Sequence, residues 1–290
     1  MKGIVLAGGT GSRLHPLTKI TSKQLLPVYD KPMIYYPIST LMLAGVREIL
    51  LITTEADSSA FRSLLGDGSN FGVEFHYAVQ PKPEGLAQAL VIGENFLSGD
   101  SCLMILGDNV FHGVGLGHDL GRTLPNLGAH IFTYTVSNPS QYGILSLSKL
   151  GKPISIVEKP KNSDSNLAVT GLYFFDAQAS KIAKQVTPSE RGELEITSVI
   201  EKYLSYDQLT YTHLSRGTAW LDTGTPAAMH DASTYVRVLE DRTGLKIACL
   251  EEIALSQGWI THVELKNQIK GTDNDYNRYL SKLIQKEMNS

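Results

Sequence analysis

Three glycines within four positions, followed by an arginine, mark the segment GGTGSR at residues 8–13. Glycines allow a backbone to turn with positive φ and to bring its amide N–H groups close to an anionic ligand. Arg13 adds a permanent cation with a planar fork that suits phosphate oxygens, and Lys23 follows ten residues later. These two cations favour a polyphosphate site over a plain turn between a strand and a helix.

The two familiar glycine fingerprints do not fit this segment. The dinucleotide pattern needs a third glycine where Leu14 stands, and the P-loop needs Gly-Lys-Ser/Thr where the chain has Gly11-Ser12-Arg13. The later segment GVGLGHDLG (113–121) also fails the dinucleotide spacing. The sequence therefore disfavours a dinucleotide-dependent oxidoreductase.

Two aspartates each follow apolar residues. Asp108 comes after CLMILG (102–107), and Asp222 comes after Trp220 and Leu221. Alone, each acid is typical of a turn or a helix cap. Mg²⁺ commonly takes one or two protein carboxylates and completes its shell with phosphate and water, so the two acids could instead hold a metal beside a triphosphate. The residues themselves leave both interpretations open.

A charged pair, Glu158 and Lys159, lies at the end of a strand-like run and directly before Pro160. One interpretation is a solvated sheet edge with an ion pair. The other is a site in which the carboxylate accepts sugar hydroxyls and the ammonium binds a sugar phosphate. The segment RGELEIT (191–197) is typical of a charged helix start, with Arg191 as a further candidate for phosphate contact.

These residues need a scaffold, and the first half of the chain predicts one of alternating strands and helices. Short apolar runs bounded by Gly, Asp or Pro predict strands, and a wider apolar spacing predicts helices. This alternation is typical of a largely parallel sheet with helices on both faces. In such sheets ligands bind beyond the carboxyl ends of the strands, which favours the glycine loop, Gln80 and Asp108. The expected strands are 3–7, 48–53, 73–79, 102–106 and 129–136, and the expected helices are 33–45, 58–68 and 85–97.

After residue 140 the pattern changes to short strands without full helices between them, which predicts hairpins or a mixed-direction insertion. Residues 226–290 are expected to form a mostly helical extension on a core of residues 1–225. The expected elements of this half are strands at 143–148, 153–160, 167–176 and 209–214, and helices at 191–204, 226–244 and 273–288.

The composition points to no macromolecular partner. The chain has 26 Lys and Arg against 29 Asp and Glu, a net charge of −3, and no run of like charges that would favour nucleic acid or a membrane surface. No apolar stretch approaches the ~20 residues of a membrane span, so a cytoplasmic protein is expected. Cys102 and Cys249 lie in apolar surroundings and are expected to be buried thiols without metal or disulfide duty.

Eleven motifs follow one another along almost the whole chain: KGIVLAGGTGSRLHPLT, SKQLLPVYDKPMIYYPISTLMLAGVREILLI, LLGDGSNFG, QPKPEGLAQA, LGDN, YGILS, EKPK, NLAVTGLYFFD, RGELEIT, AWLDTGT and GLKIACLEEIA. In order and spacing they resemble those of the glucose-1-phosphate thymidylyltransferases, a family of sugar nucleotidyltransferases. The resemblance implies a Rossmann-like, three-layer α/β/α fold with a mixed, mainly parallel central sheet. It also implies a nucleotide-binding part at about 1–135 and a sugar-phosphate-binding part at about 136–225.

The activity implied by the resemblance joins dTTP and α-D-glucose 1-phosphate into dTDP-glucose and pyrophosphate, with Mg²⁺ as cofactor. Arg13, Lys23, Asp108 and Lys159 would then be catalytic, and Asp108 and Asp222 would bind the metal. The implied nucleotide-binding residues are Gly8, Gly9, Thr10, Gly11, Ser12, Arg13, Lys23, Gln80, Gly85 and Asp108. The implied sugar-phosphate-binding residues are Tyr142, Gly143, Glu158, Lys159, Val169, Tyr173 and Arg191.

The nearest alternative is the same reaction with UTP, another nucleoside triphosphate or a different sugar 1-phosphate. Thymine differs from uracil by one methyl group, which a pocket can exploit only for ~1–3 kcal/mol. A regulatory module that binds nucleotide sugars without turnover is disfavoured by the retained charged residues. The resemblance further implies a homotetramer, a dimer of dimers, with feedback control by a downstream dTDP-sugar through residues 244–254.

Overall fold

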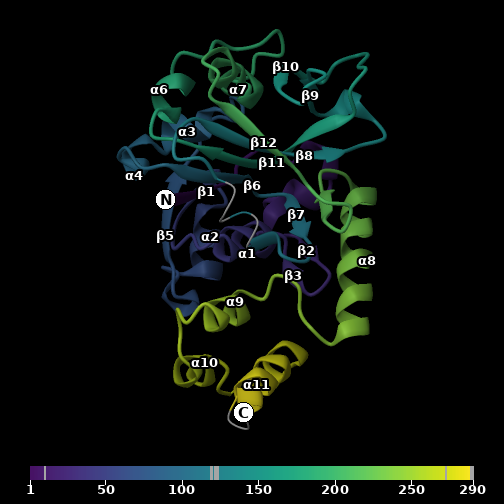
Figure 1. The fold of residues 1–290 in the computed structure, drawn as a ribbon. Coiled ribbons are helices and arrows are strands. Elements are labelled where there is room, and N and C mark those ends of the chain that lie inside the picture. The colour runs from purple at the N-terminus through teal and green to yellow at the C-terminus, as the bar shows by residue number, and fades with distance from the viewer. Residues whose placement is uncertain (10, 118–119, 121–123, 272, 288–290) are drawn as a thin grey trace.

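Four parallel strands form one half of a nine-stranded central sheet (Figure 1). The computed structural model describes residues 1–9, 11–117, 120, 124–271 and 273–287. In the order β6-β1-β4-β5 the strands bring their carboxyl ends to one edge. They are β1 (Lys2–Ala7), β4 (Glu48–Thr53), β5 (Glu74–Val79) and β6 (Cys102–Leu106), each within a residue or so of its predicted bounds.

The other half of the sheet mixes strand directions, as the sequence pattern after residue 140 predicts. The long strand β11 (Leu167–Phe175) pairs antiparallel with β6, β8 and β9, and its register to β8 shifts between Val169 and Tyr173. Strand β12 pairs parallel with β8, and β10 pairs antiparallel with β9. These strands are β8 (Ala129–Thr135), β9 (Gly143–Leu147), β10 (Pro153–Glu158) and β12 (Leu209–His213).

Helices cover both faces of the sheet because side chains alternate along its strands. In β1, Val5 and Ala7 pack into one hydrophobic cluster, while Ile4 and Leu6 pack into another on the opposite face. The expected α/β/α fold with a mixed, mainly parallel sheet is therefore confirmed. Helices α1 (Tyr35–Leu43) and α2 (Ser58–Leu65) cover the first face, and α3 (Gln88–Ile92), α4 (Glu94–Leu97), α6 (Ala179–Ala183) and α7 (Ile196–Ser205) cover the second.

Two helix predictions were wrong in their bounds. The expected helix 85–97 is divided at Gly93, where an added Cβ would lie 2.9 Å from Ile4 Cδ1 of the sheet. The expected helix 191–204 begins only at Ile196, so residues 191–195 form a loop. The charged start of RGELEIT is thus free to line a cavity instead of a helix surface.

Short strand pairs that the sequence pattern did not reveal lie beside the main sheet. Strand β7 (Asn109–His112) pairs antiparallel with β13 (Ala219–Asp222), and β2 (Pro27–Val28) pairs with β3 (Lys31–Pro32). The β7–β13 pair joins segments more than 100 residues apart. It delivers Asp222 to the same sheet edge as Asp108.

The C-terminal segment is helical, as expected, and packs on the body rather than apart from it (Figure 1). Leu250, Leu265 and Leu280 belong to the same hydrophobic cluster as the helices α1 and α2. Cys249 is buried there and Cys102 is buried in the sheet, and both are free thiols as predicted. The helices are α8 (Pro226–Thr243), α9 (Leu250–Ser256), α10 (His262–Gln268) and α11 (Asp275–Glu287).

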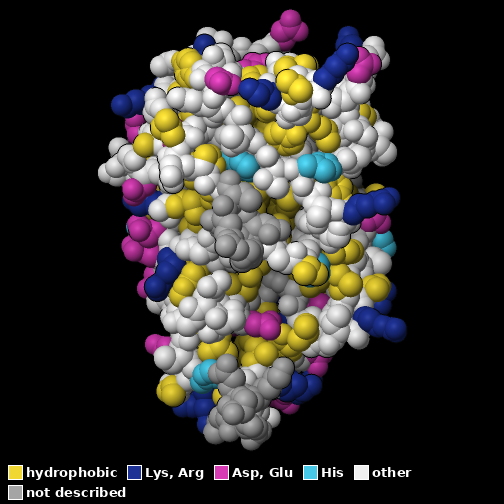
Figure 2. All heavy atoms as spheres, viewed as in Figure 1, with side chains coloured by type: hydrophobic (Ala, Val, Ile, Leu, Met, Phe, Trp, Pro, Cys, Tyr) yellow, Lys and Arg dark blue, Asp and Glu magenta, His cyan; other side chains and the backbone are white. Residues whose placement is uncertain are grey.

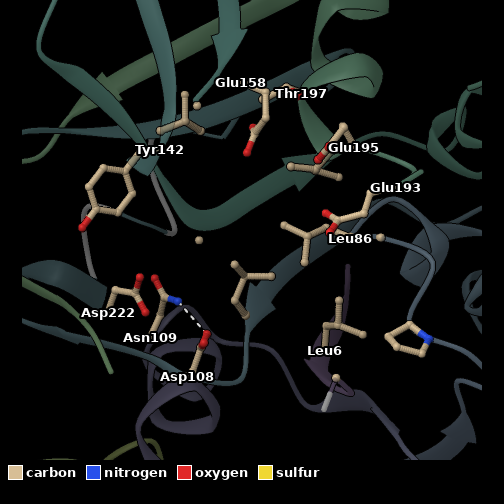
Figure 3. A pocket seen from close by; sticks show the side chains of 18 of the residues that line it. Leu6, Leu86, Asp108, Asn109, Tyr142, Glu158, Glu193, Glu195, Thr197 and Asp222 are labelled. Carbon is tan, nitrogen blue, oxygen red and sulfur yellow. Dashed lines mark hydrogen bonds between the residues drawn. The ribbon is translucent and has the colours of Figure 1, made fainter. Parts of the chain in front are cut away.

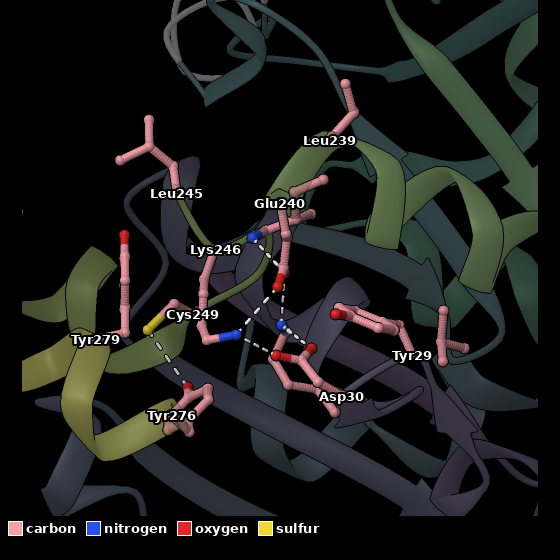
Figure 4. A network of polar contacts seen from close by, with 12 residues as sticks. Tyr29, Asp30, Leu239, Glu240, Leu245, Lys246, Cys249, Tyr276 and Tyr279 are labelled. Carbon is pink, nitrogen blue, oxygen red and sulfur yellow. Dashed lines mark hydrogen bonds and ion pairs between the residues drawn. The ribbon is translucent and has the colours of Figure 1, made fainter. Parts of the chain in front are cut away.

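An ion network around the buried Lys31 and Glu240 fastens the β2–β3 hairpin to α8 and the segment after it (Figure 4). Lys31 Nζ donates to Glu240 Oε1 at 2.9 Å, and Lys246 Nζ donates to Glu240 Oε2 at 3.1 Å. Asp30 accepts from both lysines. Burial opposes ionisation of Asp30, but the two ammonium groups outweigh it and lower its pKa. Each buried charge is therefore paired, which is the condition under which buried ions are tolerated.

Acidic and basic side chains lie interspersed over the face that Figure 2 shows. None of the helices among the described residues combines the length and apolar character needed to cross a membrane.

Candidate active site

A cavity of about 610 Å³ opens at the edge where the parallel strands end (Figure 3). It collects side chains from both halves of the sheet. Asp108, Asn109 and Asp222 lie on one side, and Tyr142 and Glu158 lie across from them. The predicted site residues that line it are Gly8, Gly9, Arg13, Lys23, Gln80, Gly85, Asp108, Tyr142, Gly143, Glu158, Lys159, Val169, Tyr173, Arg191 and Asp222.

Two predicted residues of the glycine segment, Gly11 and Ser12, are not part of this lining. Ser12 opens a 3-10 turn over Ser12–Leu14, and Gly11 precedes it with its carbonyl accepting from Thr18 Oγ1 at 2.9 Å. Thr10 lies outside the described residues. The turn places Arg13 at the cavity.

Gly8 leaves room for the side chain of Gln80. A Cβ added to Gly8 would lie 2.0 Å from Gln80 Oε1, far inside van der Waals contact. Gln80 follows β5, is 5 % exposed and lines the cavity. The first glycine of the segment is therefore required by the amide beside it.

Gly8→Ala is expected to raise KM for the ligand of this cavity about tenfold or more, because the new methyl group would clash with the Gln80 amide and force one of them to move. Initial rates at varied substrate concentration measure the change. Gly217→Ala is the matched control, since Gly217 is exposed and an added Cβ there meets nothing within 4 Å. Equal KM values for Gly8→Ala and the parent protein would contradict this arrangement.

Gly85 joins the cavity wall that follows β5 to the loop 191–195. Its φ is +122°, a backbone region that favours glycine, and an added Cβ would lie 2.4 Å from the carbonyl oxygen of Leu194. Around it, Leu194 N–H donates to Glu84 O at 2.6 Å, and Ala87 N–H donates to Leu194 O at 3.0 Å. The two walls of the cavity are thus hydrogen-bonded to one another.

Asp108 is held as an ionised carboxylate. Lys23 Nζ forms an ion pair with Asp108 Oδ2, and Asn109 Nδ2 donates to Asp108 Oδ1 at 3.0 Å. Burial acts to raise the pKa of Asp108, but the Lys23 ammonium and these hydrogen bonds outweigh it, so the pKa lies below its usual value. Asp108 is therefore charged at neutral pH.

Asp222 stands opposite Asn109 in the β7–β13 pair, so it is brought next to Asp108. Burial and the Asp108 carboxylate raise the pKa of Asp222, against the lowering effect of Lys23 and Arg13. Two carboxylates that repel each other at the edge of a cavity form an oxygen donor set of the kind that suits a hard divalent cation. These two residues could hold a metal.

A second set of charged residues lines the cavity, away from Asp108 and Asp222. It comes from the end of β10 and from the loop 191–195. Lys159 Nζ lies 3.4 Å from Glu158 Oε1, and Arg191 Nη1 lies 3.6 Å from the same oxygen. Lys159 has a φ of +44°, a left-handed conformation that is strained for a residue other than glycine. Its backbone N–H donates to Tyr142 O at 3.0 Å, which fixes it beside that ring.

Sequence reasoning missed several residues of the cavity. Glu193 and Glu195 lie in the loop expected to be a helix start, where Arg191 bonds to Glu193 Oε2 at 2.9 Å and lies 3.4 Å from Glu195 Oε1. Trp220 Nε1 donates to Asn109 Oδ1 at 2.6 Å across the β7–β13 pair. Only the acidic character of RGELEIT could have signalled the first two. The other missed polar and small residues are Gln24, Gln141, Gly171 and Thr197.

The fold and this cavity define a nucleotide-binding transferase. The family model described as "Nucleotidyl transferase" matches residues 2–238. The chain belongs to this family.

The relatives place the chain more narrowly. It is 52% identical over 288 residues to a glucose-1-phosphate thymidylyltransferase of Mycolicibacterium smegmatis, covering 99% of this chain and 100% of the relative. A crystal structure from Bacillus anthracis, described as a glucose-1-phosphate thymidylyltransferase in complex with sucrose, is 41% identical with a TM-score of 0.76 and covers 82% of this chain and 95% of its own. Within the nucleotidyl transferases, the chain therefore belongs to the glucose-1-phosphate thymidylyltransferases.

A third likeness concerns the fold alone. A UDP-glucose pyrophosphorylase solved with UDP-glucose has a TM-score of 0.74 at 22% identity, over 82% of this chain and 98% of its own. The α/β/α architecture is thus shared with a uridine-nucleotide protein.

Proposed function

We propose that this nucleotidyl transferase joins dTTP and α-D-glucose 1-phosphate into dTDP-glucose and releases pyrophosphate. The observation that carries the proposal is one cavity with two separate sets of charged groups. Arg13, Lys23 and the first two glycines of the segment form a set that suits a triphosphate. Lys159 and Arg191, which both lie beside Glu158, form a set that suits a sugar phosphate. The thymidylyltransferase name of a full-length relative at 52% identity supports the same pair of substrates.

On the nucleotide side, the backbone of residues 8–13 binds the phosphates, and Arg13 meets the charge that develops on the leaving pyrophosphate. Lys23 neutralises further charge and keeps Asp108 ionised. Gln80 contacts the base through its side-chain amide, and Gly85 does so through its backbone. Of the positions assigned here, Gly8, Gly9, Arg13, Lys23, Gln80, Gly85 and Asp108 line the cavity.

On the sugar side, Glu158 accepts hydroxyl groups of glucose, and Lys159 binds the attacking phosphate. Tyr142, Gly143, Val169 and Tyr173 shape the surrounding wall. An added Cβ at Gly143 would lie 2.8 Å from Thr197 Cγ2, so a larger residue would narrow this part of the cavity. Arg191, itself paired with acids, contributes positive charge at the rim.

The chemistry needs no general base. A phosphate monoester has its second pKa near ~6, so the sugar phosphate is largely a dianion at neutral pH and already a nucleophile. The protein must align nucleophile, α-phosphorus and leaving group and must offset the charge of pyrophosphate. Because the sugar phosphate is already a nucleophile and the protein only aligns and neutralises the reacting groups, we propose an in-line displacement without a covalent protein intermediate.

Mg²⁺ fits the oxygen donor set of Asp108 and Asp222, the two mutually repelling carboxylates at the cavity edge. When bound, it would neutralise triphosphate charge and help to orient the nucleotide. Asp108 keeps its negative charge through Lys23, and Asp222 is oriented by the Gly224 N–H, which donates to its Oδ1 at 3.0 Å.

A pyrophosphate-release assay tests the proposal directly. The purified protein is offered dTTP, UTP, dCTP, ATP and GTP, each with glucose 1-phosphate, galactose 1-phosphate and mannose 1-phosphate. We expect the highest kcat/KM with dTTP and glucose 1-phosphate. A clear preference for UTP would favour the alternative of a uridylyltransferase, and no pyrophosphate with any pair would overturn the proposed activity.

Lys159→Ala is expected to raise KM for glucose 1-phosphate roughly 10- to 100-fold with a smaller effect on kcat, because a charge-assisted hydrogen bond worth about 1.5–3 kcal/mol is lost. Lys161→Ala is the control, since Lys161 is exposed two residues further along and lies outside the cavity lining. An unchanged KM for the sugar phosphate would contradict the assignment of Lys159 to the sugar-phosphate site.

Assembly and location stay predictions. A homotetramer is what membership in this family leads us to expect, and a cytoplasmic location is expected from the sequence. Light scattering of the purified protein tests the oligomer, for which a single species of one subunit mass would contradict the expectation.

A further inference from the structure

A carboxylate and two amides form a chain of hydrogen bonds that ends at the cavity. Gln80 Nε2 donates to Gln88 Oε1 at 2.6 Å, and Gln88 Nε2 donates to Glu84 Oε2 at 2.9 Å. Glu84 lies in the exposed loop after β5, Gln88 opens α3, and Gln80 is buried where β5 ends. The chain therefore runs from solvent to the base-facing wall of the site.

The chemistry of Glu84 sets the direction of every bond in this chain. An ionised carboxylate only accepts hydrogen bonds, so Gln88 must turn its NH₂ group toward Glu84 and its carbonyl toward Gln80. The backbone N–H of Glu84, which lies 3.3 Å from Gln88 Oε1, can only donate and enforces the same orientation. Gln80 must then turn its own NH₂ group toward Gln88. Its carbonyl oxygen is left for the cavity.

The position of Gln80 Oε1 agrees with this reasoning. The oxygen lies where a Cβ on Gly8 would come within 2.0 Å, and both residues line the cavity. Among the described residues, none is seen to donate a hydrogen bond to it. Gln80 Oε1 can therefore accept a hydrogen bond from a ligand that enters the cavity.

We propose that Glu84 and Gln88 are positioning residues that fix Gln80 as a hydrogen-bond acceptor and so select the nucleobase. Thymine and uracil carry an N–H at ring position 3 and can donate to Gln80 Oε1. Cytosine has a lone pair at the same ring nitrogen and meets the oxygen with repulsion. This chain of hydrogen bonds thus discriminates keto from amino pyrimidines, and it does not discriminate thymine from uracil. This inference rests on the proposed function, in which Gln80 contacts the base.

Gln88 provides a paired test, because two substitutions there have opposite expected results. Gln88→Leu removes the partner of Gln80 Nε2, so the Gln80 amide can turn either way. The ratio of kcat/KM for dTTP to that for dCTP should fall about tenfold or more. Gln88→Glu combined with Glu84→Gln keeps an acceptor in front of Gln80 and a donor at position 84, so the ratio should stay within a few-fold of the parent protein. A merely structural role for Gln88 would not separate the two variants.

The change should lie in KM for the nucleotide, with KM for glucose 1-phosphate unaltered, and calorimetric titration of dTTP and dCTP should reproduce it as binding without turnover. Lys82→Ala, at an exposed position in the same loop and outside the cavity lining, controls for loop disturbance. An unchanged dTTP to dCTP ratio in Gln88→Leu would overturn the inference while leaving the proposed function intact. If the parent protein used no pyrimidine nucleotide, the proposed function itself would fail.

Discussion

Arg13→Ala should lower kcat about 10²–10³-fold, the range seen when one group that stabilises developing charge is removed. Arg13 reaches the cavity from the turn after the glycine segment, and it lies close enough to Asp222 to lower the pKa of that acid. Its guanidinium also packs against Gly224, where an added Cβ would lie 2.9 Å from Nη2. Because the proposed role of Arg13 is to oppose charge that grows as pyrophosphate leaves, the loss should appear in kcat more than in nucleotide KM.

Arg13→Lys keeps the charge but loses the planar fork, so it should recover part of the lost rate. Arg216→Ala is the matched control, since Arg216 is exposed and lies outside the cavity lining. Steady-state rates of pyrophosphate release measure all three variants. If Arg13→Ala kept kcat within a few-fold of the parent protein, the glycine segment would not be the site of the leaving group.

Asp222→Asn should also lower activity about 10²–10³-fold at a fixed low concentration of Mg²⁺, and more Mg²⁺ should recover part of it. The substitution keeps the size of the side chain and an oxygen that can accept from Gly224 N–H. The protein should nevertheless lose no stability. Burial and the Asp108 carboxylate raise the folded-state pKa of Asp222, so its ionisation costs more free energy in the folded protein than in the unfolded chain.

The expected effect of Asp222→Asn on folding stability can be checked by thermal melting of the protein without metal. A group whose folded-state pKa is raised contributes stability at low pH and loses it as pH rises through that pKa. At neutral pH, Asp222→Asn should therefore melt at the same temperature as the parent protein or higher. Asp231→Asn, an exposed acid on α8, should change neither activity nor Tm. Full activity of Asp222→Asn at low Mg²⁺ would contradict the assignment of Asp222 as a metal ligand.

Much of the fold could be predicted because its parallel strands are short apolar runs that end at Gly, Asp or Pro. Once these runs are taken as one parallel sheet, the residues just after them must share an edge. This rule predicts that the glycine loop, Gln80 and Asp108 lie together, and Gly8, Gly9, Gln80 and Asp108 do line the cavity. Local pattern was sufficient here because each residue follows its own strand.

The remaining parts of the site depend on contacts that no local pattern carries. Asp222 reaches Asp108 through the β7–β13 pair, and the register that sets Asp222 opposite Asn109 comes from tertiary packing. The loop 191–195 has the charges of a helix start, but Leu194 N–H donates to Glu84 O and Ala87 N–H donates to Leu194 O, which holds the loop against the segment after β5. This competition between local propensity and tertiary hydrogen bonds brings Glu193 and Glu195 into the cavity.

The arrangement of two charged sets across one cavity implies that the sugar phosphate attacks the α-phosphorus directly. The stereochemical course at that phosphorus is the most direct test. The parent protein is given one diastereomer of dTTP with sulfur at the α-phosphate, together with glucose 1-phosphate and Mg²⁺, and the configuration of the product is read by ³¹P NMR. A single in-line displacement predicts inversion. Retention would mean two displacements through a nucleotidylated side chain and would contradict the proposed mechanism.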